Sequence, residues 1–390
     1  MKLNRTKTAG AALVAGALAL TLAACGSSST PASTPDANEP AGETSSAPET
    51  SSAPETDAPT TLSGNLAGAG ASSMEKAMGG WIAGFGDSNP DVLVSYDPVG
   101  SGGGREQFIA GATLFAGSDA ALKPEEVEAA AARCFGSEPL QLPLYISPIA
   151  VIYNLPSLEA EHLQLTAETT AKIFNREITT WNDPAIAAEN PGVTLPELDI
   201  IPVNRSDESG TTENFTEWLA VASNGAWPHE ASGDWPLSGG QSGAQTQGMI
   251  DTVTSAEGTI GYADASRAGD LGTVAVGVGD EFVPYSAEAA AAVVDASPAA
   301  EGATDLQLTI NLDRATTAPG TYPVVLVSYS VACSTYDDQA DADKVKAFLS
   351  YVASEAGQER AADPSVAGSA PISGEMRTAV EAAIASISAN

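Results

Sequence analysis

Apolar residues recur with two different periods along the chain after about residue 62. Short apolar runs predict buried strands, and apolar residues three and four positions apart predict helices with one buried face. The runs predict strands at 92–96, 149–153, 200–203 and 324–331, and the spacing predicts helices at 74–85, 166–174, 211–222, 345–352 and 376–387. Because strands and helices alternate, we expect an α/β fold in which helices cover sheets.

Three helical patterns begin directly after a turn rich in glycine and hydroxyl residues. These turns are Gly68–Ser73, Gly100–Gly104 and Arg205–Thr212. A helix start exposes unpaired N–H groups and the positive end of the helix dipole, so it can bind an oxyanion. Glycine lets the backbone approach a ligand, and Arg205 adds a forked cationic donor that suits phosphate. Such turns also cap ordinary helices or form flexible loops, but three of them with an arginine favour a shared tetrahedral anion.

The first 24 residues predict an export signal rather than part of the fold. Basic residues stand within the first seven positions, and the apolar stretch at 9–23 is short for a membrane span. The stretch ends at Cys25, where a bacterial lipoprotein signal has its cysteine. We therefore expect cleavage before Cys25 and lipidation of Cys25, which would anchor the chain to the outer face of a membrane. A plain secretory signal with a chance cysteine is the alternative.

Residues 25–61 predict a linker behind the lipidated cysteine. They are rich in serine, threonine, proline and acids, and Ser45–Thr50 repeats as Ser51–Thr56. Such a composition buries too little apolar surface to offset the entropy of ordering. We therefore expect a disordered stalk.

Length and charge restrict what the rest of the chain can be. About 330 residues follow the linker, which suits two lobes better than one core. The net charge of −34 excludes a general nucleic-acid binder. It does not exclude an anionic ligand, because bulk charge is screened beyond about 8–10 Å while dipoles and one arginine act at contact distance. The negative charge should mainly lower the rate at which an anionic ligand associates.

Two cysteines besides Cys25 are present, Cys134 and Cys333. In an exported protein an even pair predicts a disulfide, which would join segments far apart in the sequence. Two buried free thiols are the alternative.

Other chemistry finds little support. The two histidines, His162 and His229, are far in sequence from the serine-rich turns, so a Ser-His-Asp hydrolase fits poorly. The chain has no zinc-ligand spacing, no phosphate-binding P-loop and no dinucleotide fingerprint. We expect no metal and no cofactor.

The globular part resembles the phosphate-binding component of the bacterial high-affinity phosphate ABC importer, from about Leu62 to near the C-terminus. The matching segments follow the order of that family. They are Gly68–Ser72, Val99–Gly104, Gly117–Ala120, Ile173–Ile186, Arg205–Thr211 and Gly258–Tyr262.

The resemblance implies a two-lobed periplasmic-binding-protein-like fold of type II. Each lobe would be a mixed sheet flanked by helices, and the chain would cross between the lobes near 145–152 and near 322–328. The expected parts are a signal at 1–24, Cys25 with the linker at 25–61, a first lobe from 62–147 and 326–390, and a second lobe from 148–325.

The resemblance also implies the ligand and the residues that hold it. The chain would be a monomeric, lipid-anchored receptor on the outer face of the cell membrane, binding inorganic phosphate between its lobes and delivering it to a permease. Asp207 would orient the arginine. The expected phosphate ligands are Ser72, Ser73, Ser101, Asp119, Arg205, Ser209, Gly210 and Thr211.

Three positions depart from the family pattern. Ser73 replaces a common aromatic residue, which matters little if only its N–H binds. Gly102 stands where a second serine is common, and Glu208 stands where glycine is common. Because Glu208 brings a carboxylate close to the expected anion, we expect it to point to solvent or to a basic residue.

Asp119 has its own physical logic. By itself it reads as a turn or cap residue. Facing an anion, a buried carboxylate is unfavourable unless the ligand keeps a proton to donate. Phosphate does so at neutral pH and sulfate does not, and an unmade buried hydrogen bond costs about 1–3 kcal/mol. We therefore expect Asp119 to discriminate against sulfate.

Three alternatives to a phosphate receptor stay open. A secreted phosphatase or esterase could use Ser101 or Ser209 as its nucleophile, although no general base is evident. The receptor could be specific for another oxyanion, such as sulfate or molybdate. A surface lipoprotein with an adhesive role is the third alternative.

Overall fold

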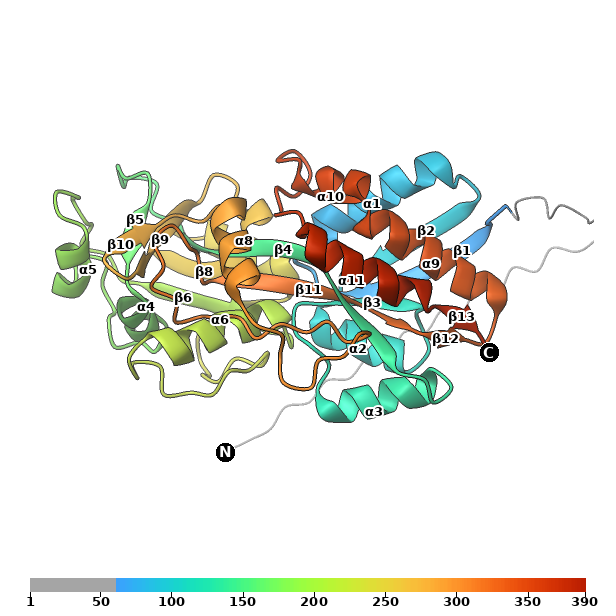
Figure 1. The fold of residues 1–390 in the computed structure, drawn as a ribbon. Coiled ribbons are helices and arrows are strands. Elements are labelled where there is room, and N and C mark those ends of the chain that lie inside the picture. The colour runs from blue at the N-terminus through green and yellow to red at the C-terminus, as the bar shows by residue number, and fades with distance from the viewer. Residues whose placement is uncertain (1–60) are drawn as a thin grey trace, which may run out of the picture. The chain divides into compact units, whose positions relative to one another are not determined.

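Two long antiparallel strands run through the middle of the fold in the computed structural model, which describes residues 61–390. β4 (Pro139–Tyr153) is buried along its whole length and pairs with β11 (Val325–Cys333). Val325 lies opposite Pro148 and Cys333 opposite Pro139, with a register shift at Ser328. Figure 1 shows these two strands passing from one half of the fold to the other. The predicted signal, Cys25 and the linker up to residue 60 lie outside the described residues.

The sheet continues on both sides of this pair, in the strand order β2-β1-β3-β11-β4-β8-β6-β7. We call the part with β1, β2 and β3 the first lobe and the part with β5 to β10 the second lobe. The predicted α/β, two-lobed fold is confirmed, and β4 and β11 are the two crossings. The boundaries expected for each lobe stay a prediction.

The first lobe has a parallel core of three strands, with β1 in the middle. Figure 1 shows helices on both faces of this sheet, with α1, α9, α10 and α11 on one and α2 and α3 on the other. The C-terminal segment therefore completes the lobe that the N-terminal segment begins. The elements are β1 (Gly64–Gly70), α1 (Glu75–Ser88), β2 (Val92–Asp97), α2 (Ser101–Ile109), β3 (Phe115–Ser118), α3 (Pro124–Arg133), α9 (Gln339–Ala353), α10 (Glu355–Ala362), α11 (Gly374–Ala385) and the short pair β12 (Thr335–Tyr336) with β13 (Ser388–Ala389).

The second lobe is continuous in sequence. β8 pairs antiparallel with β4 and parallel with β6, so β6 points its C-terminal end toward the centre of the molecule. Its elements are β5 (Leu163–Leu165), α4 (Ala167–Phe174), α5 (Pro184–Glu189), β6 (Ile201–Arg205), α6 (Gly210–Ala222), β7 (Gln241–Gly243), α7 (Gln245–Thr254), β8 (Thr259–Asp264), the 3-10 helix η1 (Ala265–Arg267), β9 (Gly272–Val278), β10 (Glu281–Val283) and α8 (Ala287–Ala296).

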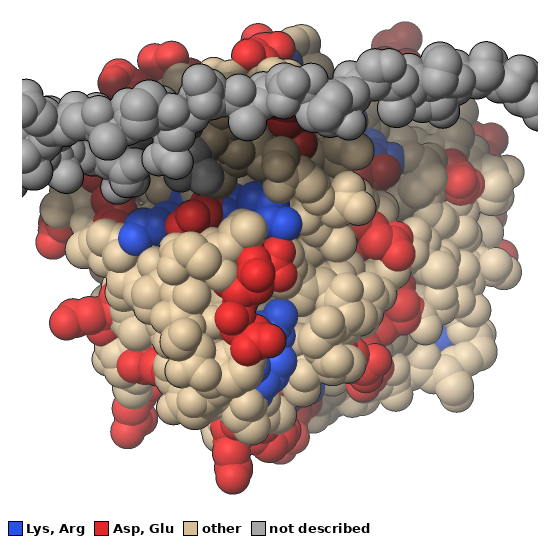
Figure 2. Space-filling view, turned by 90° about the vertical axis from the view of Figure 1, so that its right-hand side faces the viewer, with Lys and Arg blue, Asp and Glu red and all other residues tan. Residues whose placement is uncertain are grey.

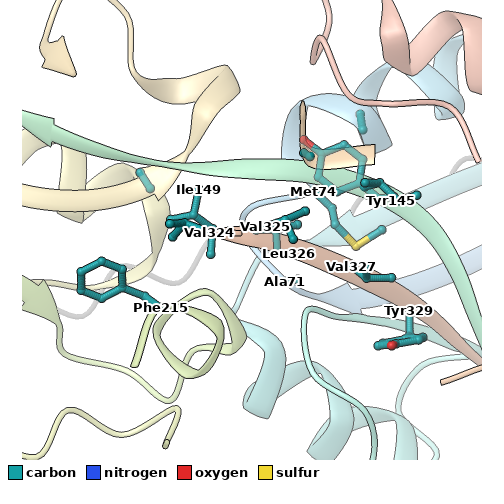
Figure 3. Packing of buried hydrophobic residues seen from close by; sticks show 14 of the residues in the cluster. Ala71, Met74, Tyr145, Ile149, Phe215, Val324, Val325, Leu326, Val327 and Tyr329 are labelled. Atoms are coloured by element: carbon teal, nitrogen blue, oxygen red, sulfur yellow. The ribbon is translucent and has the colours of Figure 1, made fainter. Parts of the chain in front are cut away.

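Apolar packing runs without interruption through both lobes and along the crossing strands. Figure 3 shows Met74 and Tyr145 near β11, with Ile149 and Val324 at the transition toward Phe215. The predicted disulfide is present between Cys134 and Cys333, whose Cα atoms are 5.3 Å apart. It ties the end of α3 to the end of β11. Within residues 61–390, no helix combines the length and apolar character needed to cross a bilayer.

Candidate functional site

The predicted ligand turns lie at the carboxyl ends of strands, next to the crossing pair. Ser72 and Ser73 follow β1, Ser101 follows β2 and Asp119 follows β3, while Arg205 is the last residue of β6. Because β1, β2 and β3 are parallel, their ends meet at one edge of the first lobe. Ligands of open α/β sheets bind at this kind of edge.

Close backbone approach in the first lobe depends on glycines. Gly70 has φ 146°, and a Cβ there would lie 2.0 Å from the carbonyl oxygen of Gly117. A Cβ on Gly104 would lie 2.3 Å from the Cα of Gly70. The start of α2 can therefore lie directly against the end of β1, so that the turn after β1 and the turn after β2 are in contact.

Asp119 is the centre of a dense group of hydroxyl donors. Its side chain is only 4% exposed. The Ser73 hydroxyl donates to both carboxylate oxygens at 2.7 and 2.8 Å, and the hydroxyls of Thr211 and Ser328 donate at 2.8 and 2.7 Å. The backbone N–H of Asp119 donates to the Ser101 hydroxyl at 3.1 Å. Since Thr211 comes from the second lobe, the two lobes are in contact at this carboxylate.

Arg205 is held by a carboxylate of its own loop. Its Nε and Nη2 donate to Asp207 at 2.8 and 2.5 Å, and Asp207 also accepts the N–H of Gln245 at 2.9 Å. Nη2 reaches the Ser72 hydroxyl of the first lobe at 3.3 Å, and that hydroxyl also accepts the N–H of Thr246 at 3.0 Å. Asp207 therefore contacts the guanidinium through two hydrogen bonds, and its expected orienting role stays a prediction.

The start of α6 is pressed against the first lobe. The Ser209 hydroxyl caps the helix by accepting the N–H of Thr212 at 3.2 Å. A Cβ on Gly210 would lie 2.7 Å from both the Ser101 hydroxyl and the Asp119 Cβ. Any side chain at position 210 would therefore push the two lobes apart.

All of the predicted ligand residues are buried and come together in one place. Their binding role stays a prediction, since the structure establishes only their arrangement. It gathers one guanidinium, one carboxylate, several hydroxyls and the starts of α2 and α6, an arrangement that can hold a small oxyanion carrying a proton. The gathered residues are Ser72, Ser73, Ser101, Asp119, Arg205, Ser209, Gly210 and Thr211.

Three polar residues that the sequence analysis missed belong to this network. Ser328 lies in the apolar strand β11, and Thr246 lies at the start of α7, a helix that no periodic pattern marked. Tyr262 donates or accepts at the Thr212 hydroxyl at 2.8 Å and accepts the N–H of Arg205 at 3.3 Å. Burial raises the pKa of Tyr262 to about 12, so it stays neutral. Tyr262 stood in the segment Gly258–Tyr262 and Ser328 in the predicted strand 324–331, but neither was predicted to belong to the site.

Glu208 points to a basic residue, as expected. Its Oε1 accepts from Nη2 of Arg105 at 2.9 Å. Arg105 is on the helix α2 of the first lobe, four residues after Ser101, and the sequence analysis did not single it out. Figure 2 shows acidic side chains spread over one face and a few basic ones, most of them next to acidic ones.

Comparison with protein families gives a match over most of the chain. A family described as a PBP superfamily domain matches residues 54–356. The phosphate-binding protein PstS 3 of Mycobacterium leprae is 35% identical over 353 residues, which are 90% of this chain and 90% of the relative. The PstS 3 protein of Mycobacterium tuberculosis is 34% identical over 391 residues, which are 99% of this chain and 100% of the relative.

Solved structures show the same fold at lower identity. A periplasmic phosphate-binding protein bound with phosphate has a TM-score of 0.63 at 20% identity, covering 81% of this chain and 93% of that chain. A phosphate-binding protein from Stenotrophomonas maltophilia has a TM-score of 0.59 at 18% identity, covering 82% and 94%. At these identities the likeness concerns the fold alone.

Proposed function

The chain belongs to the PBP superfamily and, within it, to the PstS phosphate-binding proteins, and we propose from this that it binds inorganic phosphate between its two lobes and delivers it to an ABC-type permease. It acts as a binding protein and not as an enzyme. Phosphate is held by Arg205, by the starts of α2 and α6, and by the hydroxyls that surround them.

One observation carries the proposal. A buried carboxylate, that of Asp119, and a buried guanidinium, that of Arg205, lie in one network with the glycine-rich start of α2. The guanidinium and the helix starts attract an anion, and the carboxylate accepts a hydrogen bond only from an anion that is still protonated. Phosphate at neutral pH meets both demands, whereas sulfate meets only the first.

The hydrolase alternative finds no support in the site. The hydroxyls of Ser101 and Ser209 each accept a backbone N–H, so both serve the fold. A nucleophilic serine needs a base within hydrogen-bond reach. His162 contacts Thr273 and His229 contacts Asn175, so neither histidine is hydrogen-bonded to these serines.

The same family membership supports a proposal for delivery and localisation. We propose that Cys25 carries the lipid anchor and that the linker over 25–61 lets the two lobes move near the permease. In this proposal the first lobe comprises 62–147 and 326–390, and the second lobe comprises 148–325. The receptor works as a monomer on the extracytoplasmic face of the cell membrane.

Calorimetry tests the proposed ligand. Titration of phosphate into the purified protein in phosphate-free buffer should give saturable heat with one site per chain. Sulfate and molybdate at the same concentrations should give at least about a hundredfold weaker binding, which is roughly 2.7 kcal/mol. Equal binding of sulfate, or no heat with phosphate, would contradict the proposal.

A further inference from the structure

Arg105 of α2 is buried and forms hydrogen bonds to three residues. Its side chain is 1% exposed. Nε donates to both oxygens of Glu126 at 3.0 Å, Nη1 donates to the Ser118 hydroxyl at 3.0 Å, and Nη2 donates to Glu208 at 2.9 Å. Glu126 and Ser118 belong to the first lobe, whereas Glu208 belongs to the second. One guanidinium therefore joins the loop that carries Asp119 to the loop that follows Arg205.

The fold makes room for the Glu208 carboxylate on both sides of the cleft. A Cβ on Gly102 would lie 1.9 Å from its Oε2, and a Cβ on Gly233 would lie 2.7 Å from its Oε1. Gly102 is in the first turn of α2, where the helix dipole favours a negative charge. The carboxylate is therefore seated against the helix start as well as against Arg105. A side chain at either glycine would displace it.

Glu208 stands between two residues of the phosphate site, Asp207 and Ser209. Fixing its carboxylate on the first lobe fixes the turn that carries the Arg205–Asp207 pair and the start of α6. Within residues 61–390, Arg105 contacts only protein carboxylates and a hydroxyl through its hydrogen bonds, so its charge is already matched. Arg105 thus affects the anion indirectly, by fixing the positions of the residues that we propose contact it.

We propose that Arg105 and Glu208 are positioning residues that form an ion pair across the cleft when the lobes close, hold the Asp207–Gly210 turn on the start of α2, and slow the release of phosphate. This inference rests on the proposed function. The pair exists only when the lobes are together, so breaking it should raise the dissociation rate and leave the encounter of phosphate with the open form nearly unchanged.

A second pair across the lobes supplies a matched control. Arg267 of the second lobe donates to Glu75 of the first lobe at 2.8 Å, and the Glu75 side chain is 46% exposed. Exposed ion pairs contribute little, whereas the buried Arg105 guanidinium would lose one of its two carboxylate partners and keep only Glu126. Glu208→Gln and Glu75→Gln therefore remove the same charge from two interlobe pairs of different burial.

Stopped-flow kinetics with inorganic phosphate tests the inference on the full chain. Glu208→Gln should raise the dissociation rate constant about tenfold, equivalent to 1.4 kcal/mol, and Glu75→Gln should change it less than about twofold. The association rate constant should stay within about threefold in both variants, because each removes only one negative charge from a protein of net charge −34. Thermal unfolding without phosphate identifies any variant that is misfolded, and Glu208→Ala repeats the measurement without a hydrogen-bonding side chain.

Three results would overturn the inference. They are an unchanged dissociation rate in both Glu208 variants, a slower dissociation, which would mean that Glu208 mainly repels the anion, and an equal acceleration in Glu75→Gln. Wild-type calorimetry separates this failure from failure of the proposed function, since a wild-type protein that binds phosphate but gains nothing from Glu208 contradicts the ion pair alone.

Discussion

In the proposed phosphate site, Asp119 is the residue that we expect to set selectivity. It accepts hydrogen bonds from three hydroxyls, and each of these donors could be redirected to an anion while the carboxylate accepts the proton of that anion. A fully ionised ligand has no proton to donate, so the carboxylate cannot accept a hydrogen bond from it. We therefore expect affinity and selectivity to come from different residues.

Replacing this carboxylate with an amide tests the division of roles. Asp119→Asn keeps the size of the side chain but offers an N–H donor, which a fully ionised anion accepts. We expect the ratio of phosphate to sulfate affinity to fall by about ten- to a hundredfold, corresponding to roughly 1.4–2.7 kcal/mol. Competitive calorimetry with both anions measures this ratio. An unchanged ratio would remove the selectivity role of Asp119.

The sequence could predict a candidate site at residue level because glycine, serine and arginine in turns before helices carry a recognisable chemistry. Arg205, Asp119 and the serines were predicted on this basis together with the family resemblance, and the structure brings them together. It could not identify Arg105 or Ser328, because an arginine within a helix and a serine within an apolar strand have no local pattern that distinguishes them. Their role comes only from contacts with residues 103 and 209 positions away.

At the scale of elements, β4 shows why the sequence analysis found only part of the crossing. The apolar run predicts a strand at 149–153, whereas β4 spans Pro139–Tyr153. Pro139, Pro143 and Pro148 lie within it, and proline normally argues against a central strand because it cannot donate a ladder hydrogen bond. Pro143 lies at the register shift opposite Tyr329, where the ladder is already irregular.

Helices were easier to predict where their buried face is made of large residues. The prediction of 211–222 is close to α6 at Gly210–Ala222. α8 is rich in alanine, so its buried and exposed faces differ little in side-chain size, and no helix was predicted there. α9 begins at Gln339, earlier than the predicted 345, because its first turn is polar and is capped by Asp338.

The junction of β4 and β8 should make stability depend on pH. Asp264 at the end of β8 is fully buried and accepts from Tyr145 of β4 at 3.0 Å and from the N–H of Ser266 at 3.0 Å. Burial raises the pKa of Asp264 to about 6. Because the folded state then binds more protons than the unfolded state, this group's stabilising contribution is present below about pH 4 and is lost as the pH rises through about 6.

The variant Asp264→Asn tests this pH dependence, since it cannot titrate and keeps an acceptor for the Ser266 N–H. Between about pH 4 and pH 7 the free energy of unfolding of the wild type should fall relative to the variant by roughly 2–3 kcal/mol. Urea unfolding of both proteins across this range gives the difference. Parallel curves would show that Asp264 does not titrate in this window.

At the scale of the whole molecule, the net charge of −34 opposes an anionic ligand at long range while the site attracts it at contact. Salt screens only the first effect, since the Debye length falls from about 30 Å at 0.01 M to about 8 Å at 0.15 M. We therefore expect the association rate constant for phosphate to rise a few-fold between these ionic strengths, with little change in dissociation. Stopped-flow measurements in sodium chloride test this. A fall in the association rate would show that local positive charge dominates the approach.

The first lobe is assembled from both ends of the chain, so it can be completed only late in synthesis. The edge of β3 is covered by β11, which begins only at Val325, and α9, α10 and α11 follow it. A nascent chain can complete its second lobe early. The sheet of β1, β2 and β3 is covered at its β3 edge only after the last sixth of the polypeptide has been synthesised. Until that arrival, β3 presents an unpaired edge that could join a neighbouring chain. Truncation before Val325, which removes β11, should therefore yield aggregates rather than a weakened receptor.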